Sequence, residues 1–132
     1  MFNTLDVSSS ALVAQRIRMN TCAMNLANID SVDSPEGGPY QRRFVVFEAG
    51  ASPADRSGRG VHVARIVKEP VFRTEYNPSH PYADENGYVK LPGINQVTEM
   101  VNAMEANRAY EANITVMDVT KSMFNSSLRL LA

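Results

Sequence analysis

Apolar residues recur every seven positions along the first part of the chain. One row of this repeat consists of Leu5, Leu12, Met19 and Leu26. The spacing predicts an amphipathic helix of about four heptads, which we expect to end near residues 28–30. Asn3 or Thr4 is a suitable N-cap for it. Ser9 and Arg16 occupy the other core position of the repeat, so a coiled coil that is stable alone is not expected.

A second apolar pattern runs from Ile94 to Leu131. As one helix, this segment would be about 57 Å long at 1.5 Å per residue. Its apolar positions do not form one continuous stripe along the helix, because Asn107 and Lys121 interrupt one of the rows of apolar residues. An apolar face that drifts in this way indicates more than one neighbour. Asn95 is a suitable N-cap for this helix.

Two arrangements of the long C-terminal helix fit this pattern. In the first, it forms one arm of an intramolecular helical hairpin. In the second, it packs between subunits. We favour the second arrangement, because a hairpin of two helices cannot bury two impure apolar stripes at once.

The seven glycines and seven prolines all lie between Pro35 and Gly93. Glycine and proline destabilise a helix interior by about 1 and 3 kcal/mol relative to alanine, so this distribution separates two helical ends from an irregular middle. We therefore predict an α+β fold, mainly helical, in which long terminal helices pack antiparallel in a coiled-coil-like arrangement and bring both chain ends together. The predicted parts are an N-terminal helix (1–34), a small β-hairpin-rich insert (35–93) and a long C-terminal helix (94–132).

The insert carries strand signals at residues 41–48, 61–68, 71–76 and 88–91. Asn86-Gly87, just before the last of these, predicts a type I′ turn. Residues 50–60 are small, polar and charged, which predicts a mobile hairpin loop. An insert of this size makes a weak core, so we expect it to lean on the helices or on neighbouring molecules.

Charge and side-chain chemistry argue against several classes of protein. The formal net charge is −1 and no basic run stands out, so we expect no nucleic-acid partner. Cys22 is the only cysteine, and with His62 and His80 it makes no zinc pattern. Nucleotide-binding and hydrolase motifs are missing, so we expect no enzyme activity, cofactor or metal. The sequence also has no apolar run of the roughly 20 residues that span a membrane, and no cleaved signal peptide.

Several segments resemble a known family. They are Ser10–Leu12 with Met24–Asp30, Gly37–Tyr40, the proline-rich block Asn77–Pro92, Glu99–Val101 and Arg108–Asn113. The N-terminal motif is similar to that of the bacterial flagellar rod and hook axial proteins. The proline-rich block followed by a long helix resembles the C-type proximal rod proteins of the flagellar basal body in particular. The resemblance covers essentially the whole chain, and only the loop around residues 50–60 looks generic.

The resemblance implies a structural subunit that polymerises into the drive shaft between rotor ring and hook. It implies terminal helices in the inner layer and the insert in the outer layer, within a periplasmic rod that is exported without a cleaved signal peptide. The implied partners are further copies, the B-type and F-type proximal rod proteins, the rod-to-ring adaptor, the distal rod protein and the flagellar export apparatus. Two alternatives stay open: another rod or hook-base axial protein, or a helical-hairpin adaptor protein.

Apolar and amide side chains on both predicted helices are our candidates for the assembly interface. On the first helix they are Leu5, Leu12, Met19, Asn25, Leu26 and Asn28. On the last helix they are Met104, Tyr110, Ile114, Met117, Phe124 and Leu128. The substitution Met117→Asp would place a charge in this interface, so we expect it to prevent assembly.

Overall fold

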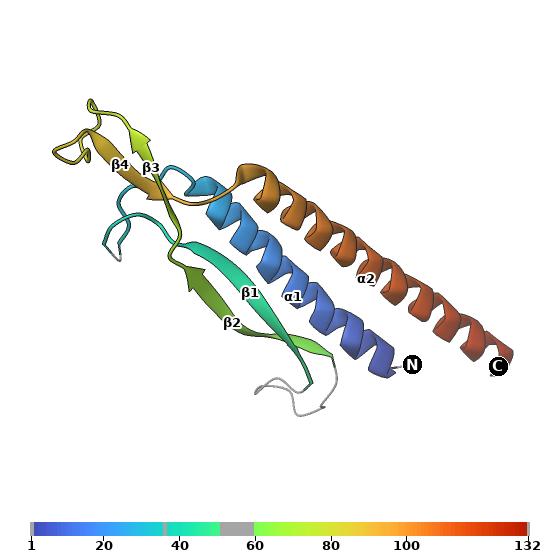
Figure 1. Ribbon diagram of the computed structural model, residues 1–132. Coiled ribbons are helices and arrows are strands. Elements are labelled where there is room, and N and C mark those ends of the chain that lie inside the picture. The colour runs from blue at the N-terminus through green and yellow to red at the C-terminus, as the bar shows by residue number, and fades with distance from the viewer. Residues whose placement is uncertain (1, 36, 51–59, 132) are drawn as a thin grey trace.

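Two long antiparallel helices dominate the computed structural model, which describes residues 2–35, 37–50 and 60–131. Helix α1 (Phe2–Ala27) and helix α2 (Gln96–Leu131) lie side by side, and both chain ends lie at the same end of the pair (Figure 1). The predicted fold class and the antiparallel arrangement are confirmed. The helices thus form an intramolecular pair, and the division of the chain into three parts remains a prediction.

The two helices begin differently from one another. The side chain of Asn95 accepts a hydrogen bond from the backbone N–H of Thr98 at 3.1 Å, which confirms the predicted N-cap of α2. Helix α1 already begins at Phe2, so the predicted cap at Asn3 or Thr4 is wrong. Packing against α2 and two strands supports α1 along its length, and such packing outweighs the missing cap.

Four strands form two separate hairpins. Strands β1 (Arg42–Ala49) and β2 (Val61–Glu69) pair antiparallel and pack on α1. Strands β3 (Phe72–Tyr76) and β4 (Tyr88–Pro92) form the second hairpin. The strand predictions are confirmed to within one residue at each end, and the first hairpin leans on the helices as expected. Most of the predicted mobile loop, residues 51–59, lies outside the described residues.

A close contact fixes the first hairpin to the start of α1. The Ser10 hydroxyl donates to the carbonyl of Val7 at 2.7 Å and accepts from the backbone N–H of Val61 at 3.1 Å. Gly60, just before Val61, has a φ of 96°, and a Cβ there would collide with the Ser10 side chain. Glycine is therefore required at this position both for its backbone conformation and for space.

The turn before β4 differs from the prediction. A type I′ turn needs positive φ at both central residues, and no described non-glycine residue has a positive φ. Instead, the Gly87 N–H bonds to the Asp84 carbonyl at 3.0 Å. The Asp84 carboxylate accepts from the N–H groups of Asn86 and Tyr88 at 2.9 and 2.8 Å. The aspartate side chain, which readily accepts hydrogen bonds from backbone N–H groups, favours a turn over residues 84–87. This turn lies one residue earlier than the predicted one.

The second hairpin is attached to the rest of the subunit by few polar contacts. Arg73 forms an ion pair with Asp30 at 2.7 Å, and the Tyr82 hydroxyl bonds to Asp33 at 3.4 Å. Val89 and Leu91 are buried on one face of the hairpin. The hairpin is thus held at the end of the helix pair where α1 ends and α2 begins (Figure 1).

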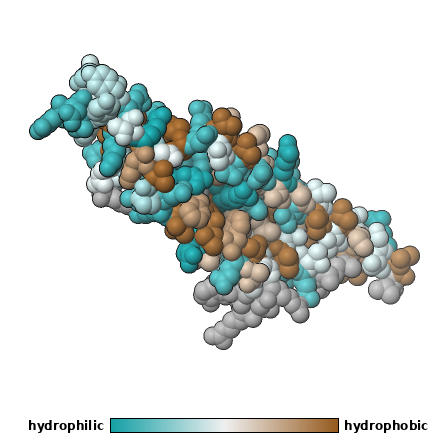
Figure 2. Space-filling model, viewed as in Figure 1, coloured by the Kyte–Doolittle hydropathy of each residue, from teal (hydrophilic) through white to brown (hydrophobic). Residues whose placement is uncertain are grey.

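The buried side chains of the two helices are mostly small or polar. They are Ser8, Ala14, Thr21, Cys22, Asn25, Glu99 and Ala106. Many large apolar side chains of the same helices are exposed, among them Val13, Met24, Val97, Met104, Val119, Met123 and Leu130. Figure 2 shows apolar residues at the surface of the helix pair, interspersed with polar ones. The usual distribution of large apolar residues inside and small or polar residues outside is therefore largely inverted.

Helix α2 extends beyond α1. Arg18 pairs with Glu105 and Asn25 with Glu99, which fixes the register of the two helices. Continued at 1.5 Å per residue, this register places the start of α1 level with about residue 121 of α2. Residues 121–130, here called the overhang, are all exposed.

Replacing Asn95 with alanine is expected to lower the free energy of unfolding by about 1 kcal/mol, because the Thr98 N–H loses its cap. Denaturant unfolding of the purified subunit measures this change. The matched control is Asn107→Ala in the interior of α2, where the amide bonds only to the exposed Glu111 and alanine is the better helix former. Equal losses for both variants would contradict the assigned cap.

Candidate assembly surface

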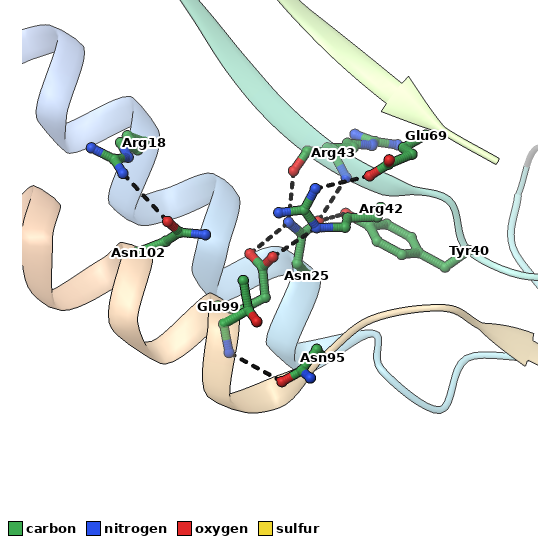
Figure 3. A network of polar contacts seen from close by, with 10 residues as sticks. Arg18, Asn25, Tyr40, Arg42, Arg43, Glu69, Asn95, Glu99 and Asn102 are labelled. Carbon is green, nitrogen blue, oxygen red and sulfur yellow. Dashed lines mark hydrogen bonds and ion pairs between the residues drawn. The ribbon is translucent and has the colours of Figure 1, made fainter. Parts of the chain in front are cut away.

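A buried amide connects α1 to the first hairpin and to α2 (Figure 3). The Asn25 side chain is fully buried. Its Nδ2 donates to the carbonyl of Arg43 at 2.6 Å and to Glu99 Oε2 at 2.9 Å. Its Oδ1 accepts from the N–H of Arg43 at 2.9 Å and from the Tyr40 hydroxyl at 3.2 Å. The Asn25 amide therefore pairs with both the N–H and the carbonyl of Arg43, as the backbone of a neighbouring strand would.

Glu99 extends this cluster to both strands of the first hairpin. Its carboxylate is only 2% exposed and accepts from Arg42 Nε at 2.8 Å. Arg42 also pairs with Glu69 of β2 at 2.9 Å. Burial alone would lower the pKa of Arg42, but its hydrogen bonds to Glu99 and Glu69 raise the pKa above its ordinary value. The cluster joins α1, α2, β1 and β2 through hydrogen bonds and ion pairs between side chains.

Cys22 lies beside this cluster and is buried. Burial raises the pKa of its thiol, and the negative charge of Glu99 raises it further. A thiol with a raised pKa is a poor nucleophile at neutral pH. Across residues 2–35, 37–50 and 60–131, no group of three or more histidine, cysteine, aspartate or glutamate residues could hold a metal ion. In the same part of the chain, neither helix is apolar over enough of its length to cross a membrane.

The candidate interface residues of α1 and the turn after it occupy two environments. Leu5, Leu12, Met19, Leu26 and Asn28 are half-buried. The carbonyl of Met24 accepts from the side-chain amide of Asn28 at 2.8 Å and from its backbone N–H at 3.1 Å, just past the end of α1. Asn25 is different, because it lies wholly inside the subunit and its amide bonds to other groups of the same chain.

The candidate residues of α2 are more accessible. Met104, Ile114, Phe124 and Leu128 are exposed, and Tyr110 and Met117 are half-buried. Phe124 and Leu128 lie on the overhang, where the helix has passed the start of α1. The four exposed side chains are thus available to a neighbouring molecule along most of the length of α2.

Sequence reasoning missed most of a second apolar row on α2. The row begins with Val97 and Val101 of the predicted apolar pattern, and the members that were missed are Val116, Val119, Met123 and Leu130. At 3.6 residues per turn, Val119 lies about 200° around the helix from Met117, so the two rows face opposite sides. The spacing of three or four residues between Val116, Val119 and Met123 was a usable signal. Each side of α2 therefore offers apolar side chains.

The comparisons with known proteins agree across the chain. A family model described as flagella basal body rod protein matches residues 5–33. A second model, flagellar basal body rod FlgEFG protein C-terminal, matches residues 85–130. The two matches cover most of α1 and of α2.

Full-length relatives extend the similarity through the hairpins. The flagellar basal-body rod protein FlgC of Salmonella typhimurium is 46% identical over 131 residues, covering 98% of this chain and 97% of the relative. FlgC of Aquifex aeolicus is 48% identical over 124 residues, with 94% and 92% covered. FlgC of Bacillus subtilis is 35% identical over 145 residues, with 98% and 97% covered. With its fold, its helix pair and this similarity in agreement, the chain belongs to the FlgC family of flagellar basal-body rod proteins, and it is a structural subunit of the basal body.

Proposed function

We propose that this subunit has no catalytic role and acts by packing its two long helices against neighbouring subunits. The observation that carries the proposal is the inverted distribution of side chains. The centre of the helix pair is filled by Ala14, Cys22 and Ala106, while Met104 and Leu130 face solvent. Burying one large apolar side chain is worth about 1.5–3 kcal/mol. The single subunit leaves this stabilisation unused, and assembly would recover it.

We propose that the interface uses both sides of the helix pair. From α1 and the turn after it, the interface takes Leu5, Leu12, Met19, Leu26 and Asn28, and from α2 it takes Met104, Tyr110, Ile114, Met117, Phe124 and Leu128. Asn25 contributes indirectly, because its buried hydrogen bonds hold α1 against β1 and α2. In this arrangement the helices form the inner, assembly layer and the hairpins the outer layer.

The wider role we propose is transmission of torque along a periplasmic rod, from the rotor ring to the hook. Many simultaneous helix contacts make a stiff shaft, because close-packed interfaces deform little. The proposed partners are further copies, the B-type and F-type proximal rod proteins, the rod-to-ring adaptor and the distal rod protein. A small subunit with no disulfide also suits passage through the flagellar export apparatus as an unfolded chain, without a cleaved signal peptide.

Purified basal bodies provide the test. Cells that lack this chain are expected not to swim, and a tagged copy should restore swimming and remain in basal bodies after detergent and salt washes. A tagged, functional copy that is absent from washed basal bodies would instead support a helical-hairpin adaptor. Swimming cells without the chain would contradict both functions.

A further inference from the structure

The turn between β3 and β4 contains a chemically reactive dipeptide, Asn86-Gly87. In a flexible chain, the backbone nitrogen of the residue after an asparagine attacks the side-chain carbonyl carbon of that asparagine. Glycine in the second position favours this attack, because it has no Cβ to hinder the close approach. Gly87 is the only glycine of the chain that directly follows an asparagine, and Asn86 is exposed. The dipeptide lies at the end of the second hairpin that points away from the helix pair (Figure 1).

In the folded subunit, hydrogen bonds hold Gly87 at both its N–H and its carbonyl. The N–H donates to the carbonyl of Asp84 at 3.0 Å, and the carbonyl accepts from the N–H of Asn77 at 2.9 Å. Gly87 is buried with a φ of 80°, and a Cβ there would lie 3.0 Å from the Tyr76 ring. The nitrogen that would attack is thus already a donor, and it cannot turn toward the Asn86 side chain without breaking the turn.

The Asp84 carboxylate fixes the residues on both sides of Gly87. It accepts from the N–H of Asn86 at 2.9 Å and from the N–H of Tyr88 at 2.8 Å. These two bonds hold the peptide units that flank the reactive nitrogen in the geometry of the turn. Replacing Asp84 should therefore release the dipeptide while leaving both reacting groups in the chain.

We propose that Asn86 is a deamidation site that the folded second hairpin protects and that becomes reactive when this hairpin opens. A bond forms between the Gly87 nitrogen and Asn86 Cγ, and the Cγ–Nδ2 bond breaks. Nδ2 leaves as ammonia, taking the proton of the Gly87 N–H. Water then opens the cyclic imide at either carbonyl carbon and gives aspartate or isoaspartate. The reaction transfers no electrons to another molecule, and water is its only co-reactant.

Both products disturb the turn that protects the asparagine. Each adds a negative charge close to Asp84 and Glu85, and like charges repel. Isoaspartate also inserts a methylene group into the main chain, which displaces Gly87 from its place beside Tyr76. The modification therefore accumulates in chains that stay unfolded, and the folded subunit is spared. The proposal is independent of the assembly function, because it concerns the single subunit.

Peptide mapping by mass spectrometry tests the proposal on the full chain. The purified subunit is incubated at mildly alkaline pH, folded in buffer or unfolded in guanidinium chloride, and conversion of Asn86 is followed with time. In the folded subunit the rate depends on how often the hairpin opens. Because two backbone hydrogen bonds must break, we expect conversion to be at least about tenfold slower there than in the unfolded chain. Asn125, which is exposed and followed by serine, is the internal reference and should convert more slowly than Asn86 in the unfolded chain.

Two variants test the role of the turn. Asp84→Ala should raise the conversion rate several-fold in the folded subunit and leave the rate in the unfolded chain unchanged. Glu85→Ala removes the same charge from the next residue, which is also exposed, and should change neither rate. Circular dichroism shows whether each variant is folded.

Three results would overturn the proposal. They are equal conversion of Asn86 in the folded and unfolded chain, conversion in the unfolded chain no faster than that of Asn125, and a folded Asp84→Ala variant that converts as slowly as the unmodified subunit. The first two results come from the unmodified chain, so they decide the matter even if Asp84→Ala does not fold.

Discussion

Replacing Glu99 with alanine is expected to destabilise the subunit by about 3 kcal/mol, the lower end of the range for breaking a buried ion pair. The substitution removes the acceptor of Arg42 Nε and one acceptor of the Asn25 amide. Arg42 keeps its contact with Glu69, and part of its side chain reaches solvent, which limits the loss. Denaturant unfolding of the purified subunit, followed by circular dichroism, measures the change.

Glu105 supplies the matched control. It also accepts from an arginine, Arg18, at 3.1 Å, but its side chain is 60% exposed. Exposed pairs contribute about 0–1 kcal/mol, so Glu105→Ala should change the free energy of unfolding little. The conservative variant Glu99→Gln should retain part of the stability, because its amide oxygen still accepts a hydrogen bond. A free energy for Glu99→Ala within 1 kcal/mol of the unmodified subunit would show that the cluster does not hold the four elements together.

Replacing Leu128 with aspartate is expected to abolish swimming while leaving the subunit's own stability unchanged. Leu128 is exposed and lies on the overhang, so an aspartate there remains hydrated in the single subunit. In the assembly the same carboxylate would be buried at an apolar contact, which is strongly unfavourable without a partner. Swimming in soft agar and the amount of chain in washed basal bodies measure the effect, and unfolding of the purified subunit measures stability. Met117→Asp should also prevent assembly, but Met117 is half-buried and its substitution would affect folding as well.

Ser126→Asp is the control for the charge itself. Ser126 is exposed on the overhang two residues before Leu128, and at 3.6 residues per turn it faces the opposite side. Swimming with Ser126→Asp but not with Leu128→Asp would show that a neighbouring molecule covers the side of α2 on which Leu128 lies. Normal swimming with Leu128→Asp would remove the overhang from the interface.

The main elements could be predicted because local signals and tertiary packing agree. The confinement of glycine and proline to residues 35–93 marks the insert, and the seven-residue spacing that begins at Leu5 marks the first helix. Asn95 was recognisable as a cap because the hydrogen bond joins residues three positions apart. Where packing overrides the local signal, as at the start of α1, the sequence alone misplaced the boundary.

The polar cluster could not be predicted because its partners are remote in the chain. Asn25 and Glu99 are 74 residues apart, and Arg42 and Glu99 are 57 apart. Their hydrogen bonds depend on the register between α1 and α2, which no single segment determines. The same remoteness explains why the sequence predicts Asn25 in the assembly interface. The helical pattern of the sequence does not distinguish an amide that bonds to its own chain from one that bonds to a neighbour.

These long separations also govern when the subunit becomes complete. The cost in chain entropy of bringing two residues together rises with the length of chain between them, and contacts between remote residues slow folding. Glu99 belongs to the last helix, so the hydrogen bonds that it accepts from Asn25 and Arg42 can form only when nearly the whole chain is available. The link between the two helices and the first hairpin is consequently completed late in folding, after the contacts between residues closer in the sequence.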